Sequence, residues 1–140
     1  MEQARTTHAF SIPVRVYYED TDAGGVVYYA NYLKFFERCR SDWMRALGYD
    51  QSQLAREHGI VFVVGGVSLQ YLKPARLDDL LSVGLEVEKL GRAQVVLRQY
   101  VRRDATDLAV GSVQIVCVDP LKMKSTAIPA WLRQQLESLA

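Results

Sequence analysis

Hydrophobic and polar residues alternate over residues 12–19 with a period of two, which predicts a strand with one buried face. Val14, Val16 and Tyr18 share one face of this strand. The alternation stops at 20–25, where Asp, Thr and Gly residues favour a turn. The pattern therefore predicts a strand that runs directly into a turn rich in carboxylates.

From about Tyr29 the hydrophobic period changes to three and four residues, which predicts an amphipathic helix. Its apolar stripe is expected to contain Tyr29, Tyr32, Leu33, Phe36, Trp43 and Leu47. Arg40 is the charged residue within the stripe, and we expect its aliphatic stem to lie on apolar surface. Gly48 is expected to end this helix, and a short second helix is expected over 52–57.

The rest of the chain alternates mostly as strands. The expected strands cover 60–71, 81–88, 93–103 and 107–118, and a closing helix covers 130–139. Lengths near ten residues and short connections favour antiparallel pairing. One amphipathic helix against one antiparallel sheet is an α+β architecture of two layers. Because a single helix leaves the other sheet face open, we expect the chain to form an oligomer.

Length and composition restrict the number of domains and the class of protein. The length of 140 residues fits one domain over 1–140, in which 1–10 form a loose N-terminal arm. Seventeen basic and 16 acidic residues leave a net charge of +1, which argues against a nucleic-acid binder. Cys39 and Cys117 lie in apolar surroundings and are expected to be buried free thiols. With neither a signal peptide nor a membrane span in the sequence, we expect a cytoplasmic protein.

The turn before the helix is the strongest candidate for chemistry. Unpaired N–H groups at a helix start can hold a developing oxyanion, and Asp22 could attack a carbonyl carbon or activate water. Turn formation and helix capping would select the same residue types without any chemistry, so both interpretations stay open. A calcium loop is excluded, because Gly24 and Asn31 stand where oxygen ligands are needed. The tyrosines at 17, 18, 28, 29 and 32 fit either a core or a site.

Residues 14–28, VRVYYEDTDAGGVVY, resemble the signature of the hotdog-fold acyl-CoA thioesterases of the YbgC type, a family associated with the Tol–Pal envelope system. Segments 30–38, 74–79 and 116–124 are similar to the same family. The resemblance extends from about Ile12 to Pro129. The broader family includes the 4-hydroxybenzoyl-CoA thioesterases.

This resemblance implies a hotdog fold, in which a curved antiparallel sheet wraps around one long helix. It implies a homo-oligomer, either a dimer or a homotetramer built from dimers, with active sites at the subunit interface. It implies hydrolysis of an acyl-CoA thioester with no metal and no organic cofactor. It also implies a position in the cytoplasm, at the inner face of the cell envelope.

The resemblance assigns three catalytic positions. Asp22 matches the catalytic aspartate of the family, as nucleophile or general base. Tyr29 falls at the helix start, where a backbone N–H polarises the thioester carbonyl, and Tyr18 matches a tyrosine near that site. Members of the YbgC type commonly carry histidine at position 29, so here no imidazole is present, whereas the backbone N–H survives any change of side chain.

Substrate contacts are expected at Gly25 and Tyr28, and at three further positions. Val64 and Gly65 are expected in the tunnel for the pantetheine arm, although a plain β-bulge would explain the glycine equally well. Arg92 follows a turn where the family places cations for CoA phosphates, and a surface arginine is the alternative.

Three charged residues complete the candidates. Glu37 is the reserve carboxylate on the helix, with a solvent ion pair as the favoured alternative. Lys122 and Lys124 either extend a phosphate-binding patch or are simply solvated.

Two other functions stay open. The chain could be a binding partner of acyl carrier protein or lipid-synthesis enzymes at the envelope, with little turnover of its own. A dehydratase on the same fold is weaker, because such enzymes pair a histidine with a carboxylate and His8 and His58 are poorly placed for this. The sequence leaves the acyl chain and the choice between dimer and tetramer undecided.

Overall fold

The computed structural model describes residues 10–138, so residues 1–9 of the expected arm over 1–10 lie outside the described part. Phe10 already belongs to the first strand. The strands are β1 (Phe10–Arg15), β2 (Val61–Tyr71), β3 (Leu80–Leu90), β4 (Gln94–Arg103), β5 (Thr106–Asp119) and β6 (Lys124–Ser125). They form one antiparallel sheet in the order β1-β3-β4-β5-β2, with β6 paired to β5. The expected strands and their antiparallel pairing are confirmed.

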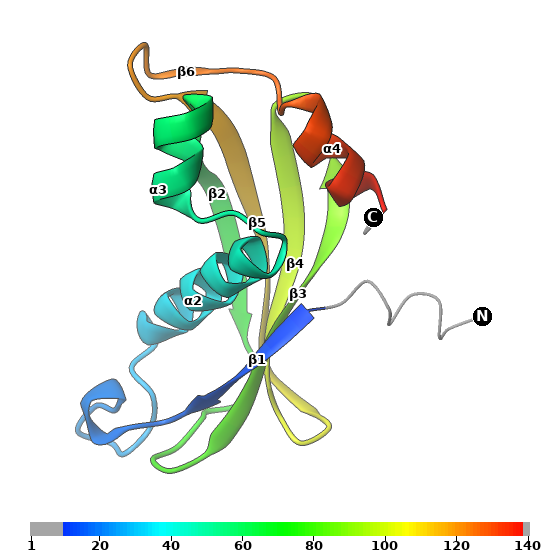
Figure 1. Cartoon of the computed structure of the whole chain (residues 1–140). Helices are drawn as coiled ribbons and strands as arrows, with labels where there is room; N and C mark the ends of the chain where they lie inside the picture. Colours follow the sequence, from blue (N-terminus) through cyan, green and yellow to red (C-terminus); the bar gives the residue numbers. More distant parts are fainter. Residues whose placement is uncertain (1–9, 139–140) are drawn as a thin grey trace.

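One long helix, α2 (Asn31–Ala46), packs on the sheet against β1, β3 and β4 (Figure 1). A short helix, α3 (Gln51–Gln53), continues as the π-helical turn η2 (Leu54–His58), and the helix α4 (Ala130–Glu137) closes the described chain. The α+β class is therefore confirmed. Gly48 follows Leu47, the C-cap residue of α2, and has φ 103°, as expected of a glycine that ends a helix.

The buried face of α2 differs in part from the expected stripe. Tyr29 precedes the helix and is exposed, and Leu33 is exposed as well. Phe35 and Cys39 are fully buried instead. The core face of α2 consists of Asn31, Tyr32, Phe35, Phe36, Cys39, Trp43 and Met44. This set also has spacings of three and four residues, so the period alone could not choose the centre of the face.

Arg40 is half-buried beside this core face. Its Nη1 donates to Oε1 of Gln99 at 2.9 Å, and Nε2 of Gln99 donates to the Phe36 carbonyl at 3.2 Å. Gln99 is fully buried, and these two hydrogen bonds give its side-chain oxygen and nitrogen partners inside the core. Burial lowers the pKa of the Arg40 guanidinium.

The two cysteines are free and buried, as expected. Burial raises the pKa of Cys39 to about 12 and that of Cys117 to about 11. Both thiols are therefore protonated at neutral pH and act as small apolar side chains.

The first strand is shorter than its alternation suggests. β1 ends at Arg15, and the 3₁₀ turn η1 (Tyr18–Asp20) follows. The carboxylate of Asp20 accepts the N–H of Tyr17 at 2.9 Å, and the N–H of Asp20 donates to the Tyr17 carbonyl at 2.9 Å. The chain therefore turns here, and Tyr18 is 82% exposed rather than on the face of Val16. The prediction for the position of Tyr18 is wrong because Asp20 closes this turn.

Candidate active site

A short antiparallel ladder joins residues 20–22 to residues 26–28. The N–H of Asp22 donates to the Val26 carbonyl, and the N–H of Tyr28 donates to the Asp20 carbonyl, both at 2.9 Å. The N–H of Gly25 donates to the Asp22 carbonyl at 3.0 Å and closes a β-turn. Gly25 has φ 79°, a backbone region that L side chains rarely adopt. The ladder presents Asp22 at its turn, on the surface.

The Asp22 carboxylate has a turn-forming role and is also accessible. Its Oδ1 accepts the N–H of Gly24 at 2.8 Å, which is an Asx turn. The side chain is exposed, and among residues 10–138 no hydrogen bond involves its Oδ2. The two interpretations of this residue are therefore compatible, because one oxygen holds the turn and the other is available to a substrate or a water.

The ladder is attached to the start of α2 by Asn31. The Nδ2 of Asn31 donates to the Asp20 carbonyl at 2.9 Å, and its N–H donates to the Tyr28 carbonyl at 2.8 Å. Just before the helix, the N–H groups of Tyr29 and Ala30 have no protein acceptor among the described residues. Such unpaired N–H groups at a helix start favour an anion or a polarised carbonyl oxygen.

Tyrosines surround this helix start. The ring centroids of Tyr28 and Tyr29 lie 4.8 Å apart, and the Tyr71 hydroxyl donates to the Tyr29 carbonyl at 3.0 Å. Tyr32 is buried, whereas Tyr17, Tyr18, Tyr28 and Tyr29 are exposed. The tyrosine cluster therefore divides into one core residue and four surface residues. A groove of about 270 Å³ is lined by Val27, Tyr29, Tyr32, Tyr71, Leu72, Lys73 and Pro74.

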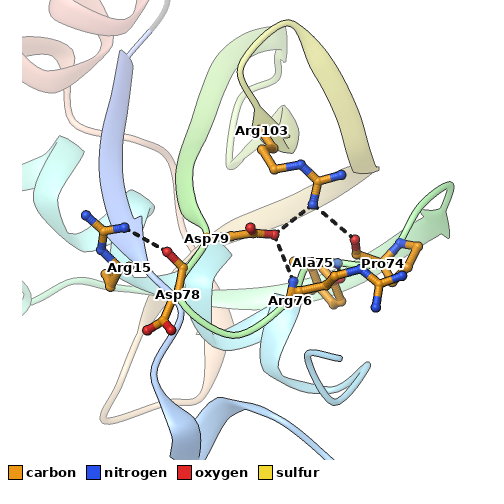
Figure 2. A network of polar contacts seen from close by, with 8 residues as sticks. Arg15, Pro74, Ala75, Arg76, Asp78, Asp79 and Arg103 are labelled. Carbon is orange, nitrogen blue, oxygen red and sulfur yellow. Dashed lines mark hydrogen bonds and ion pairs between the residues drawn. The ribbon is translucent and has the colours of Figure 1, made fainter. Parts of the chain in front are cut away.

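The β2–β3 loop contacts the ladder through backbone hydrogen bonds. The N–H of Val27 donates to the Ala75 carbonyl at 2.8 Å, and Val26 forms a bridge with Arg76. Figure 2 shows the polar contacts of this loop, including the ion pair between Asp79 and Arg103 at 2.7 Å. Sequence reasoning used 74–79 only as part of a resemblance and assigned no role to Asp79 or Arg103. The signal that was available is the carboxylate pair Asp78-Asp79, between two expected strands and shortly after Pro74.

The remaining predicted contacts lie away from Asp22 within one chain. Gly65 is the extra residue of a β-bulge in β2, between the pairs of Val64 and Gly66. A Cβ on Gly65 would lie 2.8 Å from Cγ2 of Val116, so a side chain there would clash. Arg92 is exposed in the β3–β4 turn, and its carbonyl accepts the N–H of Ile128, just before α4. Figure 1 places α4 and η1 at opposite ends of the molecule, so this turn and the ladder are not brought together.

Val64 instead borders a second cavity, of about 190 Å³, between β2 and the middle of α2. Its lining comprises Glu37, Arg40, Ser41, Trp43, Met44, Gln51, Phe62, Val63, Val64 and Ile115. Glu37 accepts the Ser41 hydroxyl at 2.6 Å and belongs to none of the ion pairs within residues 10–138. Within the described residues the partner of Glu37 is therefore Ser41, and the expected ion pair of Glu37 stays a prediction. Lys122 is exposed in the β5–β6 turn, and Lys124 is exposed at the start of β6.

Across residues 10–138, every helix is too short or too polar to span a bilayer.

Comparisons with known proteins agree with this geometry. The family model of the thioesterase superfamily matches residues 24–110, which include part of the ladder, all of α2 and most of the sheet. The acyl-CoA thioesterase YbgC of Haemophilus influenzae is 47% identical over 87% of this chain and 90% of its own length. The acyl-CoA thioester hydrolase YbgC of Escherichia coli O6:H1 is 46% identical over 88% of this chain and 92% of its own length.

A solved structure matches as well. The probable thioesterase from Bartonella henselae superposes with a TM-score of 0.82 at 32% identity, over 86% of this chain and 99% of its own. Sequence, fold and the loop before α2 thus point to one group of proteins. The chain belongs to the thioesterase superfamily, and within it this protein is a hotdog-fold enzyme of the YbgC type.

Proposed function

We propose that this protein hydrolyses the thioester bond of an acyl-CoA, as the names of the YbgC relatives state for those proteins. The observation that carries the proposal is the exposed Asp22 carboxylate on a short ladder that leads directly to the unpaired N–H of Tyr29. The N–H donates a hydrogen bond to the carbonyl oxygen of the thioester and stabilises its developing negative charge. This contact needs no particular side chain at position 29.

Asp22 supplies the other half of the chemistry. As a general base, it takes a proton from water while the water oxygen bonds to the carbonyl carbon. The carbon–sulfur bond then breaks, and the CoA thiolate leaves and is protonated. As a nucleophile, Asp22 would form an acyl anhydride that water hydrolyses in a second step. Both routes yield a free acid and CoA.

A second copy of the chain would complete the site. Within one chain, the cavity next to Val64 and the groove between Tyr29 and Tyr71 border different parts of β2. β2 is an edge strand whose exposed apolar residues include Val63, Val64, Val67 and Tyr71. An exposed apolar edge favours pairing with another strand. Antiparallel pairing of two β2 edges about the middle of the strand would bring the Val64 end of one copy toward the Tyr71 end of the other.

Val67→Glu is expected to prevent this pairing. Val67 lies near the middle of β2 and is 48% exposed, so a twofold axis would bring two glutamates together. We expect light scattering to give a monomer mass and the acyl-CoA hydrolysis rate to fall more than about 10-fold, because like charges at an interface are costly. Leu121→Glu, at a side chain that is 95% exposed in the β5–β6 turn, is the matched control. An unchanged oligomer mass in Val67→Glu would contradict pairing through β2.

A panel of acyl-CoAs tests the function itself. Free thiol release is measured for acyl chains from short to long and for an aromatic acyl group. We assign the cavity of about 190 Å³ beside Val64 to the acyl group, so we expect hydrolysis of short acyl groups and slower hydrolysis of long ones. No thiol release from any acyl-CoA would refute the function, and a preference for long chains would refute the assignment of this cavity.

A further inference from the structure

We infer that Asp79 and Arg103 are positioning residues for the active site: their ion pair fixes the β2–β3 loop, and this loop holds the ladder and the helix start in place. The inference rests on the proposed function, because the ladder carries Asp22 and leads to the N–H of Tyr29. Neither Asp79 nor Arg103 is expected to touch the substrate.

The ladder depends on the loop through one residue. The buried Ala75 contacts two parts of the site through its backbone. Its carbonyl accepts the N–H of Val27 at 2.8 Å, and its N–H donates to the Tyr32 hydroxyl at 3.1 Å. Val27 belongs to the ladder, and Tyr32 lies in the first turn of α2. A shift of Ala75 would therefore move the ladder relative to the helix start.

Asp79 and Arg103 hold Ala75 from both sides. Oδ2 of Asp79 accepts the N–H of Arg76 at 2.9 Å and Nη1 of Arg103 at 2.7 Å. The same Nη1 also donates to the Pro74 carbonyl at 3.4 Å. Figure 2 shows this arrangement, in which the Arg103 guanidinium reaches from β4 to Pro74 and Asp79, and Asp79 in turn holds Arg76. The ion pair thus fixes the backbone of Pro74 and Arg76, on either side of the Ala75 N–H that the Tyr32 hydroxyl accepts.

The charge on Asp79 is present at neutral pH. Burial raises the pKa of this carboxyl group, but the hydrogen bond from the Arg76 N–H and the Arg103 guanidinium outweigh burial and hold the pKa below its usual value. A charge-assisted hydrogen bond of this kind is stronger than a neutral one.

The far end of the loop is attached independently of these side chains. The N–H of Val16 donates to the Asp79 carbonyl at 2.9 Å, and the N–H of Asp78 donates to the Val16 carbonyl at 3.0 Å. Arg15 donates to the Asp78 carbonyl at 2.7 Å. Since these contacts use the loop backbone, we expect the loop to stay attached to β1 when the Asp79 carboxylate is removed.

The neighbouring ion pair provides a matched control. Arg102 and Asp107 lie 2.7 Å apart with side chains 35% and 33% exposed, against 34% and 21% for Arg103 and Asp79. Arg102 precedes Arg103 on β4, but its ion pair stays within the β4–β5 hairpin. Asp107→Asn should therefore remove a similar ion pair without affecting the loop.

The experiment compares Asp79→Asn and Arg103→Met with Asp107→Asn, at a temperature well below unfolding of each variant. For a short acyl-CoA, we expect Asp79→Asn and Arg103→Met to lower kcat about 10-fold to 100-fold with little change in KM, because small misplacements of catalytic groups cost rate. We expect Arg103→Lys to recover part of this loss. Amide exchange at Val27 should accelerate about 10-fold in Asp79→Asn, because its hydrogen bond then opens more often. Asp107→Asn should change neither kcat nor this exchange.

The two readouts separate this inference from the proposed function. Equal kcat values, or equal exchange at Val27, in Asp79→Asn and Asp107→Asn would overturn the positioning role. A wild-type chain that hydrolyses no acyl-CoA would refute the proposed function, and exchange at Val27 would then still decide whether the ion pair holds the ladder.

Discussion

Asp22→Asn is expected to lower kcat for acyl-CoA hydrolysis about 1,000-fold while leaving the thermal unfolding temperature unchanged, because a catalytic acid or base typically contributes this much. Asparagine keeps an oxygen that can accept the N–H of Gly24, which Asp22 now accepts at 2.8 Å. The Asx turn therefore survives. The amide carries no charge and cannot take a proton from water or attack a thioester.

Asp119→Asn is the control for this variant. Oδ1 of Asp119 accepts the N–H groups of Leu121 at 2.9 Å and Lys122 at 3.3 Å, so it caps its own turn much as Asp22 does. We expect full activity in Asp119→Asn, measured as free thiol release. Full activity in Asp22→Asn would remove Asp22 from the chemistry. If Glu37→Gln were then inactive, the reserve carboxylate on α2 would be the catalytic one.

Much of the fold could be predicted from the sequence, because periodicity reports directly which side of an element is buried. The four long strands and the long helix follow from it. The failures occurred where a specific side chain overrides the local pattern. Asp20 closes a turn that ends β1 early, and this displaces Tyr18. The start of α2 shifts from Tyr29 to Asn31, where Asn31 bonds back to the ladder.

The candidate site could be predicted only where it is local in sequence. Asp22, Gly25 and the helix start lie within ten residues of each other, so turn chemistry and capping signals locate them. Val64 lies in β2 and Arg92 lies in the β3–β4 turn. Their distances from Asp22 depend on the register of the sheet and on how copies of the chain associate. The contacts by which Ala75 supports the ladder and the helix start could not be predicted either. They are made by its backbone N–H and carbonyl, which every residue type except proline has.

We propose that the backbone N–H of Tyr29 polarises the thioester carbonyl on which Asp22 acts. Replacing Tyr29 with its α-hydroxy acid analogue converts this amide into an ester, which removes the N–H and weakens the Tyr28 carbonyl as acceptor of the Asn31 N–H. The N–H itself makes no hydrogen bond within residues 10–138, so its own loss breaks no contact of the fold, and thermal unfolding of the ester variant measures the cost of the weaker acceptor. The Tyr29→Phe variant keeps the N–H and loses only the hydroxyl group.

The most direct measurement is kcat for a short acyl-CoA in these two variants, side by side. We expect the ester variant to be about 100-fold to 1,000-fold slower than Tyr29→Phe, because removal of one oxyanion-hole donor costs this much in other enzymes. Equal kcat values in the two variants would contradict the role of the helix-start N–H.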